Sequence, residues 1–283
     1  MSSPLENRVV VMSGGSRGIG LAIAVALARA GARIALLAKT DAPHPRLPGT
    51  IHTAAEAIRA AGGEALPVVG DVRDDAQVEA FVGAAVERWG AIDVVVNNAS
   101  AISLAPIADL PPKRYDLMLD INLRGTYLLT RAALPHLRAS GHAHVLTLSP
   151  PLSADARWLR GHAPYTVSKM GMSMITLGVA EDEREHGVGA NCLWPRTLIA
   201  TAAVQNLLGG DRAMAMSRTP EIVADAARAI LERDPRVATG NTYVDDEVLA
   251  EEGVTDLGRY RADPGGELAL DLFVGGWPSA ASG

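Results

Sequence analysis

The sequence predicts a doubly wound α/β fold: a seven-stranded parallel sheet flanked by helices and followed by an extended C-terminal tail. Short apolar, β-branched runs alternate with longer helical segments along the 283 residues. A glycine-rich turn also joins the first apolar run to the first helix. We expect strands near 8–13, 33–38, 65–70, 92–98, 143–149, 188–194 and 240–245, and helices near 18–30, 51–61, 75–89, 113–138, 164–186 and 219–233.

Local signals support individual elements. The first strand, 8–13, is apolar and β-branched, which is typical of a buried parallel strand. The helix after it is expected to stop at Gly31, because glycine readily adopts the left-handed conformation that ends helices. The second strand, 33–38, is again an apolar run. Thr219 and Pro220 predict the start of the last helix, with threonine as its cap and proline in its first turn.

The chain is predicted to hold one large domain, 1–245, and a C-terminal extension, 246–283. The extension is longer than the sheet requires, and it contains Phe273 and Trp277. Because apolar side chains favour burial, we expect it to pack on the body of the protein or on a neighbouring subunit.

Composition excludes several classes of protein. A net charge of −6 and a pI near 5.7 disfavour nucleic acid or an anionic membrane surface as the main partner. The single cysteine, Cys192, cannot form an internal disulfide and is expected to be a buried thiol. No apolar run approaches the length of a membrane span, and residues 1–8 lack the apolar core of a secretion signal. We therefore expect a soluble cytoplasmic protein with no bound metal.

The glycine turn at 14–20 has the strand–turn–helix context of a phosphate-binding loop. Gly14 would permit a tight turn, Gly18 would allow close approach of phosphates, and Gly20 would let the helix pack closely on the strand. The spacing is G-x-x-x-G-x-G, which differs from the general G-x-G-x-x-G fingerprint.

The same turn also matches G-x-S-x-G, the nucleophile elbow of α/β-hydrolases, with Ser16 as the nucleophile. A hydrolase elbow follows several strands that build its oxyanion hole, whereas this turn follows the first strand. Its position therefore favours phosphate binding.

Tyr165 and Lys169 are four residues apart after Pro164, which can open a helix. This spacing places the phenol and the ammonium on one helical face. A tyrosine has an ordinary pKa of about 10, and a neighbouring cation is expected to lower it toward the working range of an acid–base catalyst. Tyr/Lys pairs on solvated helices are common, so the pair needs the support of the other motifs.

Together these motifs resemble the short-chain dehydrogenase/reductase family over nearly the whole chain. The resemblance implies a Rossmann-type fold and an NAD(P)-dependent oxidoreductase. It is carried, in order, by the turn Ser13–Gly20, the strand end Asn97-Asn-Ala-Ser100, Asn122, a serine near Ser149, and the pair Tyr165 and Lys169. The cofactor-binding residues that it implies are Gly14, Ser16, Arg17, Gly18, Ile19, Gly20, Lys39, Asp71, Val72, Asn98, Ala99, Tyr165, Lys169 and Pro195.

The residues after the second strand favour NADP over NAD. A carboxylate at this place holds the ribose of NAD, whereas a cation accommodates the 2′-phosphate of NADP. Lys39 follows the strand directly, and Arg17 in the glycine turn is a second cation. Asp41 lies two residues further and leaves NAD as the alternative. The resemblance assigns Asp71 to the adenine amino group, although a turn residue at a strand end would look the same.

The catalytic motifs match the family less well. The resemblance assigns the proton transfer to Tyr165, the nicotinamide ribose to Lys169 and a relay water to Asn122. Its substrate-holding serine falls at Pro150, so we expect Ser149 to serve, with Ser153 as the second candidate. The other departures are Pro195-Arg196 in place of the family's P-G, and His162, which is either a substrate contact or a solvated residue.

Two functions remain open. The first is NADP-dependent interconversion of a hydrophobic alcohol and its ketone or aldehyde, in lipid metabolism. The second is an NADP-binding protein with little catalysis, because the serine is displaced. The tail and Leu152, Trp158, Trp194 and Leu198 could line an apolar substrate pocket or could equally belong to the core. The resemblance also implies a homodimer or homotetramer in which two subunits pair helices 75–89 and 113–138.

Overall fold

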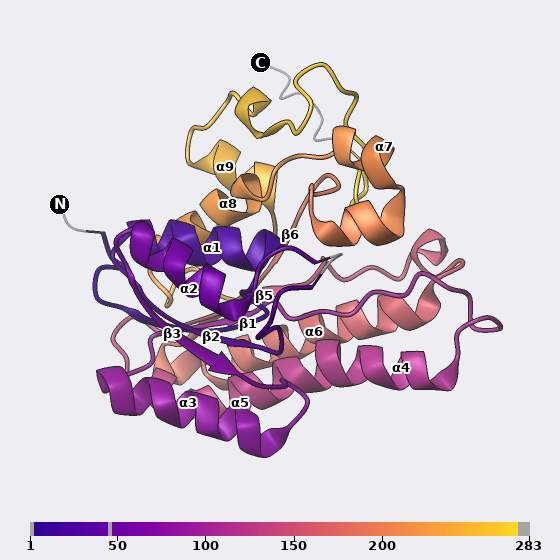
Figure 1. Cartoon of the computed structure of the whole chain (residues 1–283). Coiled ribbons are helices and arrows are strands. Elements are labelled where there is room, and N and C mark those ends of the chain that lie inside the picture. Colours follow the sequence, from indigo (N-terminus) through magenta and orange to yellow (C-terminus); the bar gives the residue numbers. More distant parts are fainter. Residues whose placement is uncertain (1–2, 45–46, 277–283) are drawn as a thin grey trace.

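The protein has a parallel sheet between two layers of helices, in a computed structural model that describes residues 3–44 and 47–276 (Figure 1). The sheet has seven strands in the order β3-β2-β1-β4-β5-β6-β7, and every neighbouring pair is parallel. The predicted fold class is therefore confirmed. The strands are β1 (Val9–Ser13), β2 (Arg33–Ala38), β3 (Glu64–Val69), β4 (Val94–Asn97), β5 (His144–Leu148), β6 (Gly189–Trp194) and β7 (Thr242–Val244).

Helices cover both faces of the sheet. One layer contains α1 (Gly18–Arg29), α2 (Ile51–Ala60) and α8 (Glu221–Glu232), and the other contains α3 (Asp75–Trp89), α5 (Gly125–Leu137) and α6 (Ala163–Asp182). Three shorter helices are α4 (Pro112–Leu119), α7 (Gly210–Ala215) and α9 (Asp245–Glu251).

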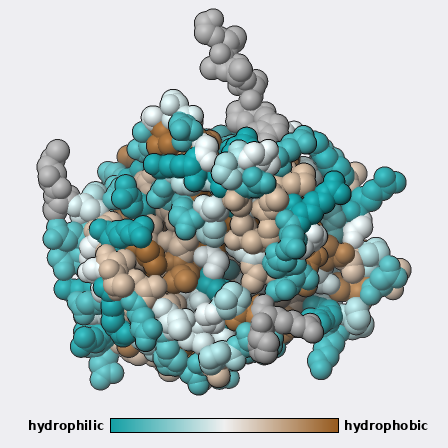
Figure 2. Space-filling view, turned by 45° about the horizontal axis from the view of Figure 1, so that its top comes forward, coloured by the Kyte–Doolittle hydropathy of each residue, from teal (hydrophilic) through white to brown (hydrophobic). Residues whose placement is uncertain are grey.

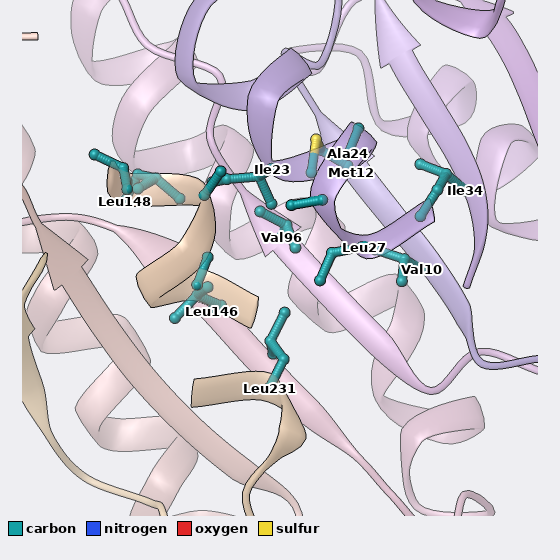
Figure 3. Close-up of a cluster of buried hydrophobic side chains, with 14 of the residues drawn as sticks. Val10, Met12, Ile23, Ala24, Leu27, Ile34, Val96, Leu146, Leu148 and Leu231 are labelled. Carbon is teal, nitrogen blue, oxygen red and sulfur yellow. The ribbon is translucent and has the colours of Figure 1, made fainter. Parts of the chain in front are cut away.

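Alternation along the strands builds two separate cores. Val10 and Met12 of β1 join the core under α1 and α8, whereas Val9 and Val11 join the core under α3 and α5. Successive side chains of a strand point to opposite faces, so one apolar strand can supply both cores. Figure 3 shows the first core, where Ile23 of α1 lies close to the strand side chains.

The helix boundaries differ from the sequence-based expectation at several places. The segment predicted as one helix at 113–138 is continuous, but a π-helical stretch, Asp120–Arg124, interrupts its α-helical hydrogen bonding. Helix α8 begins at Glu221, so Pro220 precedes it rather than lying in its first turn. Helices α7 and α9 were not predicted. Each has fewer than eight residues, which leaves little periodic pattern to detect.

The described part of the tail packs on the body of the same chain. A bridge pairs Thr197 with Leu270, and the indole Nε1 of Trp194 donates to the carbonyl of Leu272 at 2.7 Å. Trp277 lies outside the described residues. On the face shown in Figure 2, hydrophobic patches lie among predominantly hydrophilic residues.

Within the described residues, no helix combines the length and apolar character that crossing a bilayer requires.

Candidate active site

The order of the strands reverses beside β1, and its neighbour β4 ends at the same edge of the sheet. Ligands of open α/β sheets bind outside the carboxyl ends of strands at such a point. The glycine turn lies there. Gly14 has φ of 75°, and a Cβ on it would lie 2.7 Å from the Cα of Ala99. A Cβ on Gly20 would lie 2.4 Å from the Nδ2 of Asn98, so both positions require glycine.

A cavity of about 490 Å³ opens beside this turn. Helix α1 begins here with no side-chain cap at Arg17, which leaves the amide groups of its first turn available to an anion. Glycines, free helix amides and nearby cations fit the pyrophosphate and ribose of a dinucleotide. Of the residues predicted to bind a cofactor, those that line this cavity are Gly14, Ser16, Arg17, Gly18, Ile19, Gly20, Lys39, Asp71, Val72, Asn98 and Ala99.

Several of these side chains already have partners. The Nζ of Lys39 lies 3.1 Å from the Oδ2 of Asp71, and the guanidinium of Arg73 binds both oxygens of that carboxylate. The bonds from Arg73, with a smaller contribution from Lys39, hold the pKa of Asp71 well below its usual range. Asn98 donates its side-chain amide to the carbonyl of Gly14 at 2.8 Å. A bound adenosine would therefore have to share Asp71 and Asn98 with the protein.

Arg17 braces the loop beside the cavity. Its guanidinium donates to the carbonyl groups of Pro48 and Gly49 and to the hydroxyl of Thr40, at 3.0–3.1 Å. The cation is thus held at the cavity wall next to the end of β2, within the same lining as Lys39.

A second cavity, of about 310 Å³, contains the other predicted residues Tyr165, Lys169 and Pro195. Its walls are mostly apolar and include the predicted Trp194 and Leu198, but not Leu152 or Trp158. The two cavities are adjacent, because both are lined by Ile19, Asn98, Ser100, Ile102, Thr201 and Ala203.

Tyr165 and Lys169 reach this cavity from one face of α6. The ring of Tyr165 is buried and stacks on Phe273 with centroids 6.1 Å apart, while its hydroxyl has no hydrogen-bond partner among the described residues. Lys169 donates to the carbonyl of Leu148 at 2.6 Å and lies 5.1 Å from the ring of Trp194.

The expected lowering of the tyrosine pKa by lysine does not appear in this structure. Burial, assisted by the negative charge of Asp271, raises the pKa of Tyr165 far above its usual value. Burial also lowers the pKa of Lys169 to about 7, so the ammonium is only partly charged near neutrality. The mostly apolar wall disfavours both charged forms, because it limits the hydration of either ion.

Asn122 is fully buried in the π-helical stretch and does not line either cavity. Its side chain accepts from the amide of Ala101 at 2.7 Å and donates to the carbonyl of Ala101 and to the hydroxyl of Ser168. It therefore ties the segment after β4 to α6, one residue before Lys169.

The structure does not bring the predicted serines to the cavity. Leu148 lines the cavity, so Ser149, the next residue, lies on the other side, with its hydroxyl buried and near the Cys192 thiol. The hydroxyl of Ser153 accepts from the amide of Asp155 outside the cavity. The two prolines after Ser149 do not re-aim its side chain.

Arg196, which stands where the family has the glycine of its Pro-Gly pair, does not line the cavity and has a structural role. Its buried guanidinium binds Asp246 at 3.1 Å, Glu247, and the carbonyl of Gly276 at 2.7 Å. The arginine thus links α9 and the tail to the loop after β6. His162 is half-buried and lies near Phe273, and its Nε2 has no hydrogen-bond partner among the residues that the structure describes.

Sequence reasoning offered the tail as a possible wall of the pocket but did not identify which of its residues form that wall. Leu270, Asp271 and Leu272 line it, and Phe273 covers Tyr165. The signal was an aspartate within a short apolar run of an otherwise polar tail, but no spacing connects this run to Tyr165.

The family of short-chain dehydrogenases matches residues 8–210. The chain is a short-chain dehydrogenase/reductase. It is 50% identical to hydroxysteroid dehydrogenase-like protein 2 of Rattus norvegicus and 49% identical to that of Xenopus tropicalis, over 98% of this chain. It spans 52% and 66% of the length of these two relatives.

Among solved structures, the chain is similar to a putative dehydrogenase from Xanthomonas campestris. The identity is 49% and the TM-score is 0.92, over 95% of this chain and 98% of that one. The resemblance inferred from the motifs is confirmed, and with it the assignment to an enzyme family of NAD(P)-binding oxidoreductases. The family match excludes the alternative interpretation of the turn at Ser16 as the nucleophile elbow of an α/β-hydrolase.

Proposed function

We propose that the protein is an NADP-dependent oxidoreductase that interconverts a hydrophobic alcohol and its ketone or aldehyde. One observation carries the proposal: the apolar cavity that contains Tyr165 and Lys169 lies beside the cavity at the glycine turn and shares wall residues with it. A substrate in the first cavity would therefore meet a nicotinamide ring placed from the second. When bound, the dinucleotide would supply or accept the hydride.

Tyr165 acts as the acid and base in this proposal. Its free hydroxyl would donate a proton to the substrate oxygen in the reduction and accept one in the oxidation. Its buried ring, packed on Phe273, would hold the hydroxyl in one position, as proton transfer requires.

Lys169 assists Tyr165 and binds the nicotinamide ribose. Burial lowers its pKa to about 7, and the bond to Leu148 fixes its position. Charge at Lys169 would favour the phenolate that Tyr165 becomes after proton donation. Asn122 is a positioning residue here, because its bonds to Ala101 and Ser168 hold α6 against the segment after β4. We propose no role for Ser149.

The lining of the cavity supports a hydrophobic substrate. Aliphatic and aromatic side chains form most of its wall, and about 310 Å³ suits a small or elongated molecule. Such an apolar wall would exclude water from the reacting carbonyl and strengthen the electrostatic effect of nearby polar groups.

NADP is the proposed cofactor, with NAD as the alternative. Lys39 and Arg17 both line the cavity next to the end of β2, where the 2′-phosphate would lie. The nearby Asp41 is paired with His52 at 2.6 Å, which disfavours its use as a ribose ligand. In this assignment the phosphate would compete with Asp71 for Lys39.

A cofactor-binding protein without catalysis is the less favoured alternative. Binding alone would not require Tyr165 and Lys169 to be buried together in the wall of a second cavity.

We further propose a homodimer or homotetramer, since exposed apolar side chains lie on α5 and α6: Tyr127 is 49% exposed and Met174 is 64% exposed.

A screen of NADPH consumption tests the proposal. Aliphatic aldehydes, terpenoid aldehydes, steroid ketones and acyl-CoA ketones cover the hydrophobic carbonyl classes, and the same screen with NADH measures the cofactor preference. We expect turnover in at least one class with NADPH preferred. NADPH binding without turnover of any class would favour the non-catalytic alternative.

A further inference from the structure

The cavity that contains Tyr165 is mostly apolar, yet the tail places an acid in it. Among its described lining residues, Asp271 is the only carboxylate. It lines this cavity and not the one beside the glycine turn, so it lies on the substrate side. A carboxyl group in such a wall loses hydration, and a charged or polar group is retained there only where something offsets that cost.

Hydrogen bonds hold both the backbone and the carboxyl group of Asp271. The amide of Asp271 donates to the carbonyl of Arg196 at 3.0 Å, and its Oδ1 accepts from the amide of Leu272 at 2.6 Å. Leu272 is itself held to β6, because the indole of Trp194 donates a hydrogen bond to its carbonyl group. The second oxygen, Oδ2, has no hydrogen-bond partner among the described residues.

The substrate side of the cavity otherwise lacks the hydroxyl that the family uses there. Ser149 and Ser153 both lie outside it. Ser100 and Thr201 do line it, but they also line the cofactor cavity and so lie at the boundary between the two. Tyr165 therefore lacks a serine partner on the substrate side, where Asp271 lies.

The chemistry of the surroundings decides which form of the acid is present. Burial, with the negative charge of Asp245 of α9, raises the pKa of Asp271 to about 7, while the bond from the amide of Leu272 and the charge of Lys169 of α6 act in the opposite direction. The acid in turn raises the pKa of Tyr165 and of Lys169. A large part of the Asp271 population is thus a neutral acid near neutral pH. A buried neutral carboxylic acid can donate a hydrogen bond to a substrate oxygen, as in ketosteroid isomerase.

We propose that Asp271 is a further catalytic residue, which holds the substrate oxygen beside Tyr165 by donating a hydrogen bond from its carboxylic acid group. This inference rests on the proposed function. Asp271 keeps its own proton throughout, because the proton that reaches the substrate oxygen comes from Tyr165. Its free Oδ2 is the atom that donates, and its Oδ1 stays on the amide of Leu272.

Two substitutions test whether Asp271 acts as a hydrogen-bond donor or as an anion. Asp271→Asn keeps a donor in nearly the same shape, and Asp271→Leu keeps the volume but removes the donor. Asp263→Leu is the matched control, because Asp263 of the same tail accepts an amide bond from Gly265 but lies outside the cavity. Activity is measured as NADPH oxidation with the best carbonyl substrate, and NADPH binding and melting temperature are measured alongside.

We expect Asp271→Leu to lose about 10²–10³-fold in kcat, the usual loss when one oxyanion donor is removed. Asp271→Asn should stay within about tenfold of the parent. NADPH binding should be unchanged in both variants and in the control. The parent should lose activity as the pH rises through about 7, where Asp271 loses its proton. The Asn variant should lose less, and its remaining dependence belongs to Lys169.

Two outcomes would overturn the proposal. Full activity of Asp271→Leu would show that no donor is needed, and equal losses in the Asn and Leu variants would show that the anion or the fold matters instead. If the Leu variant melts early, the pH profile of the near-isosteric Asn variant still decides, since an unchanged profile contradicts the proposal. The Tyr165→Phe variant separates a failure of the proposed function from a failure of the role of Asp271. Full activity of Tyr165→Phe would contradict the proposed function itself. An inactive Tyr165→Phe together with a fully active Asp271→Leu would contradict only the role of Asp271.

Discussion

Replacing Tyr165 with phenylalanine should abolish turnover while leaving the fold intact. The hydroxyl has no hydrogen-bond partner among the described residues, and the ring keeps its contact with Phe273 at 6.1 Å in either residue. Stability should therefore change by less than about 1 kcal/mol, because no hydrogen bond is lost. Loss of a general acid lowers the rate by about 10²–10⁴-fold, which corresponds to about 3–5 kcal/mol in the activation free energy.

The assay compares steady-state NADPH oxidation, NADPH binding and thermal melting in the parent, Tyr165→Phe and Tyr127→Phe. Tyr127 is the matched control, because it is 49% exposed on α5 and lines neither cavity. We expect only Tyr165→Phe to lose turnover, with binding and melting unchanged in both variants. Turnover by Tyr165→Phe at the parent rate would refute the role of Tyr165, and a large drop in its melting temperature would refute the reading of its hydroxyl as unpaired.

Three further predictions address the cofactor, acid stability and assembly. Lys39→Ala should lower the ratio of NADP to NAD affinity about tenfold, the low end for a charge-assisted bond because Lys39 is 60% exposed; an unchanged ratio in fluorescence titration would assign the phosphate to Arg17. Burial lowers the pKa of His144 from 6.5 to about 3, so stability is lost as the pH falls between these values, by up to about 1.4 kcal/mol per pH unit. His144→Leu should flatten this loss in melts against pH, and an equal slope would contradict it. Light scattering should give a multiple of the 29.5 kDa chain mass, and a monomer would exclude the oligomer.

The sequence predicted those parts of the site that depend on short local patterns of residues. The glycine turn at 14–20 and the Tyr165/Lys169 pair each depend on spacing within one strand–turn–helix or one helix, where periodicity fixes the relative positions of side chains. The predicted cofactor residues accordingly line the two adjacent cavities. Ser149 shows the limit: a one-residue shift at a strand end turns a side chain to the other face.

The sequence by itself determined the fold class, the alternation of the strands with the long helices, and the family, because alternating apolar runs and ordered motifs depend only on neighbours along the chain. Tertiary structure alone decided that Lys39 pairs with Asp71 and that Arg196 binds Asp246 and the tail. It also decided that Asp271 faces the cavity of Tyr165, about a hundred residues away in the chain. Such contacts form only when the sheet brings distant loops to one edge, and no local pattern records which residues meet there.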